Sequence, residues 1–512
     1  MTGPPQANAS ERPLLDTCTC RLSQTNKAMI SPLPVAVQLR TALQEAKVGF
    51  ALWKSNKYID EALAGKTDLD MLVNRKDEAA FERILCNLKA IRVLSQPWAR
   101  YPDVVDWLVF DGATGDFLHL HVHFDMLTGL KRVKHLRLPW ADTVLENLRI
   151  EERNGWPIPI AEMELLILLV RIWAKMPPWR RLFAPKIPAR VKDELLWLES
   201  EAQIMRLAAL AKTLGLHADI HLPLGGDAAV IALARNLYGQ VKQHYRMNWS
   251  AALVWAAVLN FRLALTRIWL RLIGPARYRK TLTGGGAMIA FIGSDGSGKS
   301  TVSQSFERWL RRKIDVHLLY MGSGDGRAGW INAARRQLAK LLGKKLKRAG
   351  RMKETSPANS VSFAEKVYRL FDLLLLRRKL RLLRLGRRLA DGGSVILLDR
   401  YPQSQFEAVS DGPRLQNGRS FAWAAERERR LYSEAARLGP DLVIKLKIAP
   451  ETALSRKPDH NPDVIRRKCT ITDALQFPGS QVCEIDAGRS LEEVLAATKQ
   501  AVWTHLAKAE PS

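Results

Sequence analysis

The pattern of hydrophobic and polar positions changes twice along the chain, and the first part mixes two periods. Apolar residues alternate with polar ones in "FALWKS" from Phe50 and "TDLDMLVN" from Thr67, which predicts two strands. The run "KDEAAFERILCNLKAI" has helical spacing. In "VDWLVFDGATGDFLHLHVHFDM" two alternating runs flank a glycine-containing turn, as in a β-hairpin. We therefore expect an α+β domain here.

From Met163 the spacing becomes helical. "EMELLILLVRIWAKM" and "VKDELLWLESEAQIMRLAALAKTLGL" predict helices, with Gly215 at a plausible stop. The run "AALVWAAVLNFRLALTRIWLRLIG" is the best membrane candidate, but its uninterrupted apolar part ends at Leu259, which is shorter than the roughly 20 residues of a span. We interpret it as an amphipathic helix that packs on a neighbouring domain; the Trp and Arg pattern leaves a lipid interface as the alternative.

The third part follows "GPARYRKTLTGGG", which we interpret as a linker made flexible by its three glycines. Short apolar runs then alternate with helices, as in "AMIAFIG", "SVILLD" and "DLVIKLKI". This pattern predicts a doubly wound parallel sheet and the α/β fold class. The expected organisation is a disordered tail (1–27), an α+β domain (28–155), a helical extension (156–274), a Gly-rich linker (275–286) and a parallel-sheet domain (287–508).

The composition shows a large excess of positively charged residues. A chain of 512 residues is long enough for two or three domains, and 79 Lys and Arg against 51 Asp and Glu give a net charge of +28. Such an excess favours binding to polyanions such as nucleotides, nucleic acid or an anionic membrane. It is equally typical of proteins from a GC-rich genome, in which arginine is common. Five scattered cysteines and no visible secretory signal indicate a reducing cytoplasm.

The strongest chemical motif lies at the start of the third part. The residues from Gly293 to Ser300 fit the Walker A pattern, follow an apolar strand and open a helix. In such a loop, glycines let backbone N–H groups point at phosphate oxygens, the lysine adds charge, and the serine hydroxyl can bind Mg²⁺. The expected nucleotide-binding residues are Gly293, Ser294, Asp295, Gly296, Ser297, Gly298, Lys299, Ser300 and Thr301.

Two further elements place charged side chains at the same edge of the predicted sheet. The strand "SVILLD" delivers Asp399 and Arg400 at its carboxyl end, where ligands of open parallel sheets bind. Asp399 could hold Mg²⁺ through water, and Arg400 could clamp a phosphate oxygen. The segment that begins with "PDLVIKLKIAPETALSRKP" carries a run of basic residues, which we interpret as a lid over a migrating phosphoryl group; the alternative is a solvated basic helix. These residues are Arg456, Lys457, Arg466, Arg467 and Lys468.

Residues 326–353 contain ten Lys and Arg and no acid. This stretch could meet a polyanion, a lipid-linked substrate or an anionic membrane, and a solvated insertion is an equally good interpretation.

Together these motifs resemble the thymidylate kinase-like family of P-loop nucleoside-monophosphate kinases, over about Met288 to Leu506. The resemblance rests on "GSDGSGKST", "DRY" after "LADGG", "PDLVIKL" with "PETALSR", and "EIDAGRSLEEV". It implies ATP on the P-loop residues Lys299 and Ser300, the acceptor phosphate at Arg400, and transition-state contacts from Arg456 or Arg466. The family's acidic-proline-glycine segment is replaced by "YMGSGDGRAGW", so kinase chemistry is implied more strongly than thymidylate specificity. "SDGPRL" at 410–415 is a candidate for a different acceptor pocket.

The first part resembles nucleotidyltransferase-like domains through "LWKSNKYIDEALAGKTDLDMLV". Asp68 and Asp70 alternate on one strand, so both carboxylates face one side and could share divalent metal ions. The resemblance implies a third carboxylate on a neighbouring strand, but a histidine, His121, stands at that place, with Asp106, Asp111 or Asp125 as substitutes. His119, His121 and His123 suggest a metal site or a half-exposed polar face.

We thus predict an ATP- and Mg²⁺-dependent kinase that transfers a phosphoryl group to a nucleotide or another small phosphorylated substrate. It would act in the cytoplasm, with peripheral membrane contact as a variant. The alternatives are a nucleotide-binding regulatory protein and a bifunctional kinase and nucleotidyltransferase.

Overall fold

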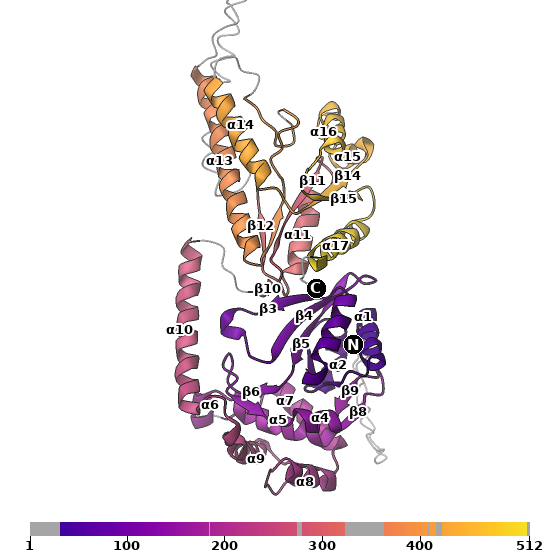
Figure 1. Ribbon diagram of the computed structural model, residues 1–512, viewed down its shortest axis with the longest axis vertical. Coiled ribbons are helices and arrows are strands. Elements are labelled where there is room, and N and C mark those ends of the chain that lie inside the picture. The colour runs from indigo at the N-terminus through magenta and orange to yellow at the C-terminus, as the bar shows by residue number, and fades with distance from the viewer. Residues whose placement is uncertain are drawn as a thin grey trace, which may run out of the picture.

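The computed structural model describes residues 31–183, 185–273, 279–322, 363–407, 409–415 and 422–508. For residues 267–273 and 363–370 it describes the backbone only. Two units lie one above the other along the long axis, as Figure 1 shows. The lower unit contains the first sheet and its helices, and the upper unit contains the second sheet. The predicted tail 1–27 and the basic stretch 326–353 lie outside the described residues.

The lower unit is built on a mixed six-stranded sheet in the order β1-β2-β5-β4-β3-β10. Strands β2 and β5 are parallel, and the other neighbours are antiparallel. Its strands are β1 (Phe50–Leu52), β2 (Leu69–Val73), β3 (Ile91–Leu94), β4 (Val104–Asp111), β5 (Asp116–His123) and β10 (Thr281–Leu282). Around it are α1 (Pro34–Glu45), α2 (Ile59–Leu63), α3 (Glu78–Asn87), and the 3-10 helices Asn56–Tyr58, Arg75–Asp77 and Pro97–Ala99.

The alternation of side chains along β5 determines which residues lie on each face of the sheet. Leu118, Leu120 and Val122 are buried in the core shared with α1 and α3. Because successive side chains of a strand point to opposite faces, the histidines between them share the other face. Register then places Asp106 of β4 opposite His121, and His121 beside Asp70 of β2. The hairpin and the strand predicted at Asp70 are both present.

Helices and two small hairpins complete the lower unit. The strands are β6 (Met126–Thr128), β7 (Leu136–Leu138), β8 (Leu148–Ile150) and β9 (Pro157–Pro159). The helices are α4 (Ala141–Glu146), α5 (Ala161–Lys175), α6 (Pro178–Phe183), α7 (Ala189–Glu201), α8 (Ile204–Thr213), α9 (Asp227–Gln240), the 3-10 helix Val241–His244 and α10 (Trp249–Ile273). Helix α5 is buried along nearly its whole length, so it is the axis of this helical extension.

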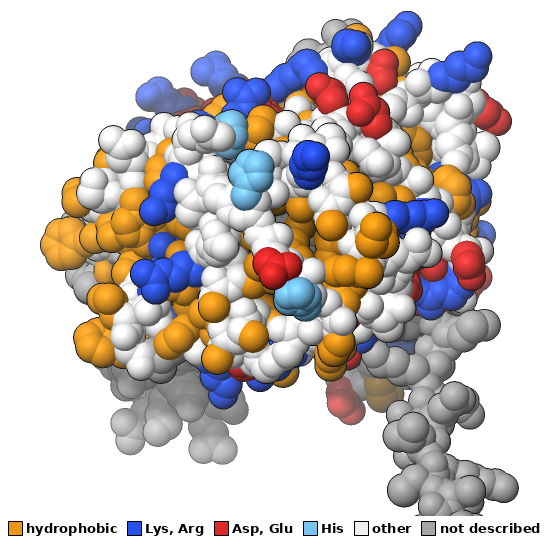
Figure 2. Space-filling view, turned by 90° about the horizontal axis from the view of Figure 1, so that it is seen from below, with side chains coloured by type: hydrophobic (Ala, Val, Ile, Leu, Met, Phe, Trp, Pro, Cys, Tyr) orange, Lys and Arg blue, Asp and Glu red, His pale blue; other side chains and the backbone are white. Residues whose placement is uncertain are grey.

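Helix α10 stands apart from the units that it borders (Figure 1). Its apolar window Trp249–Thr266 is only 17% buried, and length and composition alone would let it cross a membrane. Trp255 and Phe261 are exposed on it, and Leu182 is exposed on α6. Figure 2 shows hydrophobic side chains gathering at the edge where α6 and α10 lie. The helix packs on the lower unit along one side, where Ala252 is buried with Leu130 and Val133. The expectation that it packs on a neighbouring domain holds for this side only, and its other apolar side chains stay exposed.

The upper unit is a five-stranded, wholly parallel sheet in the order β12-β13-β11-β14-β15. Its strands are β11 (Ala287–Gly293), β12 (Val316–Leu319), β13 (Val395–Leu398), β14 (Leu442–Lys447) and β15 (Gln481–Asp486). Its helices are α11 (Lys299–Leu310), α13 (Phe363–Asp391), α14 (Ala422–Arg437), α15 (Pro450–Arg456), α16 (Pro462–Ala474) and α17 (Leu491–Lys508). The predicted α/β class with a parallel sheet is confirmed, because the central apolar runs are buried on both faces, as parallel strands require.

One hydrophobic core joins the two units. Phe110 and Phe117 of the first sheet pack on Trp309 and Trp503 of the upper unit, with ring centroids 5.2–6.0 Å apart. The Trp503 indole N–H donates to the Lys89 carbonyl over 2.9 Å. Both sheets contribute to a single buried cluster, so the two units form one body.

The segment between the units is also structured where it is described. We expected residues 275–286 to be a flexible linker, but Thr281 and Leu282 form β10 and pair with β3. Gly286 is required by close packing, since a Cβ there would lie 1.9 Å from the Ser394 carbonyl oxygen. Glycine in this segment is therefore required for close packing as much as for backbone flexibility.

Candidate functional site

The carboxyl edge of the upper sheet gathers the residues that the sequence singles out. Strand β11 lies between β13 and β14, so the loop after β11 and the residues after β13 meet at this edge. The loop 293–298 leads from β11 into α11, whose N-terminus carries free backbone N–H groups and a positive dipole end. Such an edge is where ligands of open α/β sheets bind.

Glycine is necessary in this loop for two separate reasons. Gly296 and Gly298 have φ angles of +86° and +79°, in the left-handed region that other residues adopt only with strain. A Cβ on Gly296 would also lie 2.8 Å from the Ala453 carbonyl oxygen. The sequence therefore folds into a tight turn between β11 and α11 that only glycine permits at these positions.

Lys299, the first residue of α11, curls back over the loop. Its Nζ donates to the carbonyl oxygens of Gly293, over 2.8 Å, and of Ser294, over 2.6 Å. Burial lowers the pKa of Lys299 to about 8, with nearby Arg400 and Lys468 acting in the same direction. A bound phosphate could replace the two carbonyls as the acceptor for this ammonium group.

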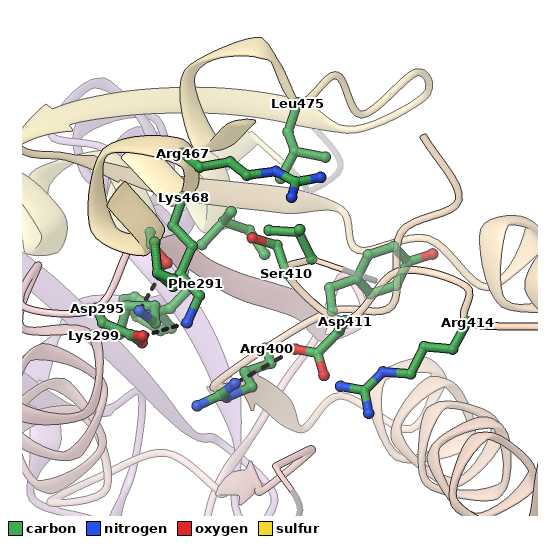
Figure 3. Close-up of a pocket in the computed structure, with 15 residues that line it drawn as sticks. Phe291, Asp295, Lys299, Arg400, Ser410, Asp411, Arg414, Arg467, Lys468 and Leu475 are labelled. Carbon is green, nitrogen blue, oxygen red and sulfur yellow. Dashed lines mark hydrogen bonds and ion pairs between the residues drawn. The ribbon is translucent and has the colours of Figure 1, made fainter. Parts of the chain in front are cut away.

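A cavity of about 270 Å³ opens beside Lys299. It is bordered by five cationic and two acidic side chains, which Figure 3 shows converging from several elements. The Asp295 carboxylate pairs with the Lys468 ammonium at 2.5 Å. Burial opposes the charge of Asp295, but this hydrogen bond prevails and lowers its pKa. The charged lining residues are Asp295, Lys299, Arg400, Asp411, Arg414, Arg467 and Lys468, and their positive excess suits an anionic ligand.

Asp399 and Arg400 differ in how firmly they are held. The buried Asp399 accepts a hydrogen bond from the Met321 backbone N–H over 2.6 Å, and burial raises its pKa. Arg400 has looser ion pairs, 4.0 Å to Asp399 and 3.8 Å to Asp411. Within the described part of the chain its guanidinium therefore borders the cavity without a close carboxylate, which leaves N–H groups for a ligand.

A second cavity of about 130 Å³ adjoins the first. Arg400, Asp411 and Arg414 border both cavities. Most of the other lining residues of the second cavity belong to α13 and α14, including Asp372, Arg378, Lys379, Glu428 and Tyr432. A ligand in one cavity can thus approach a ligand in the other across the same guanidinium groups.

Two of the arginines expected in a lid do not border either cavity. Arg456 donates to the Ala487 carbonyl over 2.9 Å and to the Gly296 carbonyl over 3.4 Å, so it contacts the outer side of the loop. Arg466 forms an exposed ion pair with Asp463. Helical periodicity points the next two residues of α16, Arg467 and Lys468, into the first cavity instead.

Sequence reasoning identified the loop, Arg400 and the segment 410–415, and it missed the contribution of α13. Asp372, Arg378 and Lys379 lie within a long helix rich in Lys and Arg, where many cations simply face solvent. Lys379 pairs with Asp411 at 2.5 Å, a contact between residues far apart in sequence. Composition could not single out these residues, because only the fold brings α13 against the segment 410–415.

The first sheet carries a separate cluster of carboxylates and imidazoles. Asp106 accepts from His121 Nδ1 over 2.7 Å and lies 3.1 Å from His119 Nε2. It also pairs with Lys280 at 2.6 Å. Asp106 is therefore the acid of β4 that stands in this cluster, whereas Asp111 caps the Val35 N–H and Asp125 pairs with Arg137.

Asp70 of β2 and Asp68, which lies just before this strand, are each engaged by a lysine. Asp68 contacts His119 Nδ1 at 2.7 Å and is paired with Lys313 from the upper unit. Asp70 pairs with Lys54 at 2.7 Å. A pair of Mg²⁺ ions requires several carboxylate oxygens free of competing cations. The cluster does not fit that arrangement, because lysines occupy all three carboxylates, Asp68, Asp70 and Asp106.

The upper unit holds two candidate oxygen ligands for one magnesium ion, Ser300 and Asp399, and neither side chain lines the two cavities. Ser300 exposes its hydroxyl at the start of α11, and Asp399 keeps one carboxylate oxygen outside the bond from Met321. A hydroxyl and a carboxylate are the oxygen ligands that Mg²⁺ prefers, with water completing its shell.

Fold and site together define an α/β protein whose parallel sheet ends in a cationic, anion-binding edge. No family model matches the chain. The uncharacterised ATP-binding protein YghR of Escherichia coli K12 is 32% identical over 224 residues, which is 42% of this chain and 86% of YghR. The chain therefore belongs to the family of YghR.

A second relative supports this assignment. The uncharacterised ATP-binding protein YghS of the same organism is 29% identical over 228 residues, which is 43% of this chain and 93% of YghS. The alignments leave more than half of this chain without a counterpart in either relative.

Proposed function

We propose that the chain is an ATP-dependent phosphotransferase of the thymidylate kinase-like type. It would transfer the γ-phosphoryl group of ATP to a nucleoside monophosphate or a similarly phosphorylated acceptor. The observation that supports this best is the pair of adjoining cavities that share Arg400, Asp411 and Arg414. A donor in the first cavity and an acceptor in the second would present their phosphates to the same guanidinium groups. The names of YghR and YghS as ATP-binding proteins support the identity of the donor.

The proposed roles follow from position. The loop 293–298 and Lys299 would bind the phosphates of ATP, since Gly293, Asp295 and Lys299 line the first cavity at the N-terminus of α11. Arg400 and Arg414 would orient both phosphates and offset the charge on the transferred group. Ser300 and Asp399 would hold Mg²⁺, which when bound neutralises phosphate charge. Arg467 and Lys468 would help exclude water above the cavity.

The test is acceptor-dependent ADP formation from Mg-ATP by the full chain. The acceptors would be deoxynucleoside monophosphates, sugar phosphates and lipid-linked phosphates. We expect Lys299→Ala to reduce turnover at least ~100-fold, because a hydrogen-bonded charge on the transferring phosphate is lost.

Lys313→Ala is the matched control, since Lys313 follows the other end of α11 and contacts Asp68 instead of the cavity. It should keep normal turnover. ATP binding without acceptor-stimulated turnover would instead support a nucleotide-binding regulatory protein.

A further inference from the structure

The first sheet presents a cluster of metal-binding side chains that the proposed kinase chemistry does not use. Asp70, His121 and His123 each offer a ligand atom, and these atoms all lie within 4.8 Å of one another. The residues come from the adjacent parallel strands β2 and β5, in register, so the backbone holds them rigidly. Two imidazoles and one carboxylate are a common ligand set for zinc and related transition metals.

His123 supplies an independent indication that something binds here. Its side chain is 1% exposed, and neither ring nitrogen has a hydrogen-bond partner among the residues that the structure describes. The nearest acceptor, Asp70 Oδ1, lies 3.6 Å from Nε2, which is too far for a hydrogen bond. A buried polar group without a partner costs free energy, so such groups normally bind protein, water or an ion.

His121 is already oriented for coordination. Its Nδ1 lies 2.7 Å from the ionised Asp106 carboxylate and therefore carries the proton of that hydrogen bond. A ring that donates through Nδ1 to this carboxylate presents Nε2 as its ligand atom. A carboxylate behind a ligating histidine fixes the tautomer and makes the imidazole a better ligand. Asp106 would be a positioning residue here, not a ligand.

We propose that Asp70, His121 and His123 bind one divalent transition-metal ion of the zinc, cobalt or manganese class. The site replaces the two-magnesium arrangement that the D-x-D strand suggests. Asp68 is excluded from it, because His119 and Lys313 engage its carboxylate. Three protein ligands leave at least one open coordination position on such an ion.

The open position determines what the ion could bind. Asp70 borders a cavity of about 250 Å³ that is also lined by Lys54 and Arg190. Two cations beside an open metal position favour an anionic ligand, such as a carboxylate or a phosphate. Lys54 pairs with Asp70 at 2.7 Å, so the ion would have to displace this ammonium group.

The experiment is Co²⁺ and Zn²⁺ binding to the chelator-treated full chain. Calorimetry would give the affinity, and the visible absorption of Co²⁺ would report nitrogen and oxygen ligands. We expect one ion per chain. His121→Ala and His123→Ala should each weaken binding at least ~10-fold, and Asp106→Asn about 10-fold through loss of the oriented tautomer. Lys54→Met should strengthen binding, since it removes the competing cation.

Control variants distinguish this site from a magnesium site at Asp68 and from a loss of folding. Asp68→Asn should leave Co²⁺ affinity within about twofold, because Asp68 is not a ligand. His121 is partly exposed, so its variant is expected to fold even if His123→Ala does not, and ATP binding by the upper unit reports folding independently. Unchanged Co²⁺ affinity in the folded His121→Ala protein would overturn the proposal. So would a preference for Mg²⁺ that needs Asp68.

Discussion

The two units hold their charged residues in opposite ways. In the upper unit, five cations border one cavity beside two carboxylates, so positive charge is left over for a ligand. In the lower unit, Asp68, Asp70 and Asp106 each lie against a lysine. Two of these lysines, Lys280 and Lys313, come from beyond the helical extension. A D-x-D motif or a P-loop therefore indicates a site for its usual ligand only when the fold leaves its charges uncompensated.

The largest effect is expected from a substitution that breaks the contact between the two units and lowers the stability of the chain. Trp503→Ala removes a large, 2% exposed side chain from the core that both sheets share. We expect a loss of about 3–5 kcal/mol in the free energy of unfolding. Chemical denaturation would measure it. A loss below about 1 kcal/mol, or an unchanged midpoint, would show that the units do not depend on this core.

The charge of the upper site should depend on pH. Lys299 is charged below its pKa of about 8 and neutral above it, and the charged form is the one that binds phosphate. ATP affinity should therefore be highest below pH 8 and fall roughly tenfold between pH 7 and pH 9. Calorimetry in buffers of different ionisation enthalpy should show proton uptake on binding near pH 8. ATP binding without proton uptake would contradict the assigned role of Lys299.

The two cavities can be separated by a pair of substitutions. Arg467 borders only the first cavity and Arg378 only the second. Arg467→Ala should weaken ATP binding about fivefold with little change in the KM of the acceptor, and Arg378→Ala should do the reverse. The exposed neighbour Arg377→Ala is the control for helix α13. Equal effects of both variants on both substrates would argue against separate donor and acceptor cavities.

The smallest effect concerns the contact between Lys313 and Asp68. Both side chains are partly exposed, so Lys313→Ala should cost less than about 1 kcal/mol of stability. It should also free one carboxylate and raise Mg²⁺ affinity of the lower unit a few-fold, while ATP affinity stays constant. Calorimetry with Mg²⁺ would measure the change. Unaltered Mg²⁺ binding would mean that Lys313 does not compete with cations at Asp68.

The sequence was a good guide to local features. Buried parallel strands are continuous apolar runs, so β11, β13 and β14 could be predicted, as could the loop at Gly293 that requires glycine. The hairpin β4-β5 followed from strict alternation. Each of these features depends on residues near one another in the chain, which is where periodicity carries information.

Contacts between distant segments could not be predicted. Strand β10 has two residues, too few for any period, and its pairing with β3 depends on where the upper unit docks. Lys280 and Lys313 reach the aspartates for the same reason. Phe110 and Phe117 look like ordinary core residues in sequence, so nothing marks them as the contact between units. The exposure of α10 also required three-dimensional information, since an apolar helix is usually covered.

The shared core also constrains how the chain could meet a lipid bilayer. Helix α10 has the length and composition of a membrane span, yet the chain on both sides of it is tied to the lower unit. Before it, the Arg246 N–H donates to the His135 carbonyl, and after it, β10 pairs with β3. A single crossing would carry β10 to the opposite side and pull it from its neighbour. In topological terms, both units must stay on one side of any bilayer while this pairing is intact.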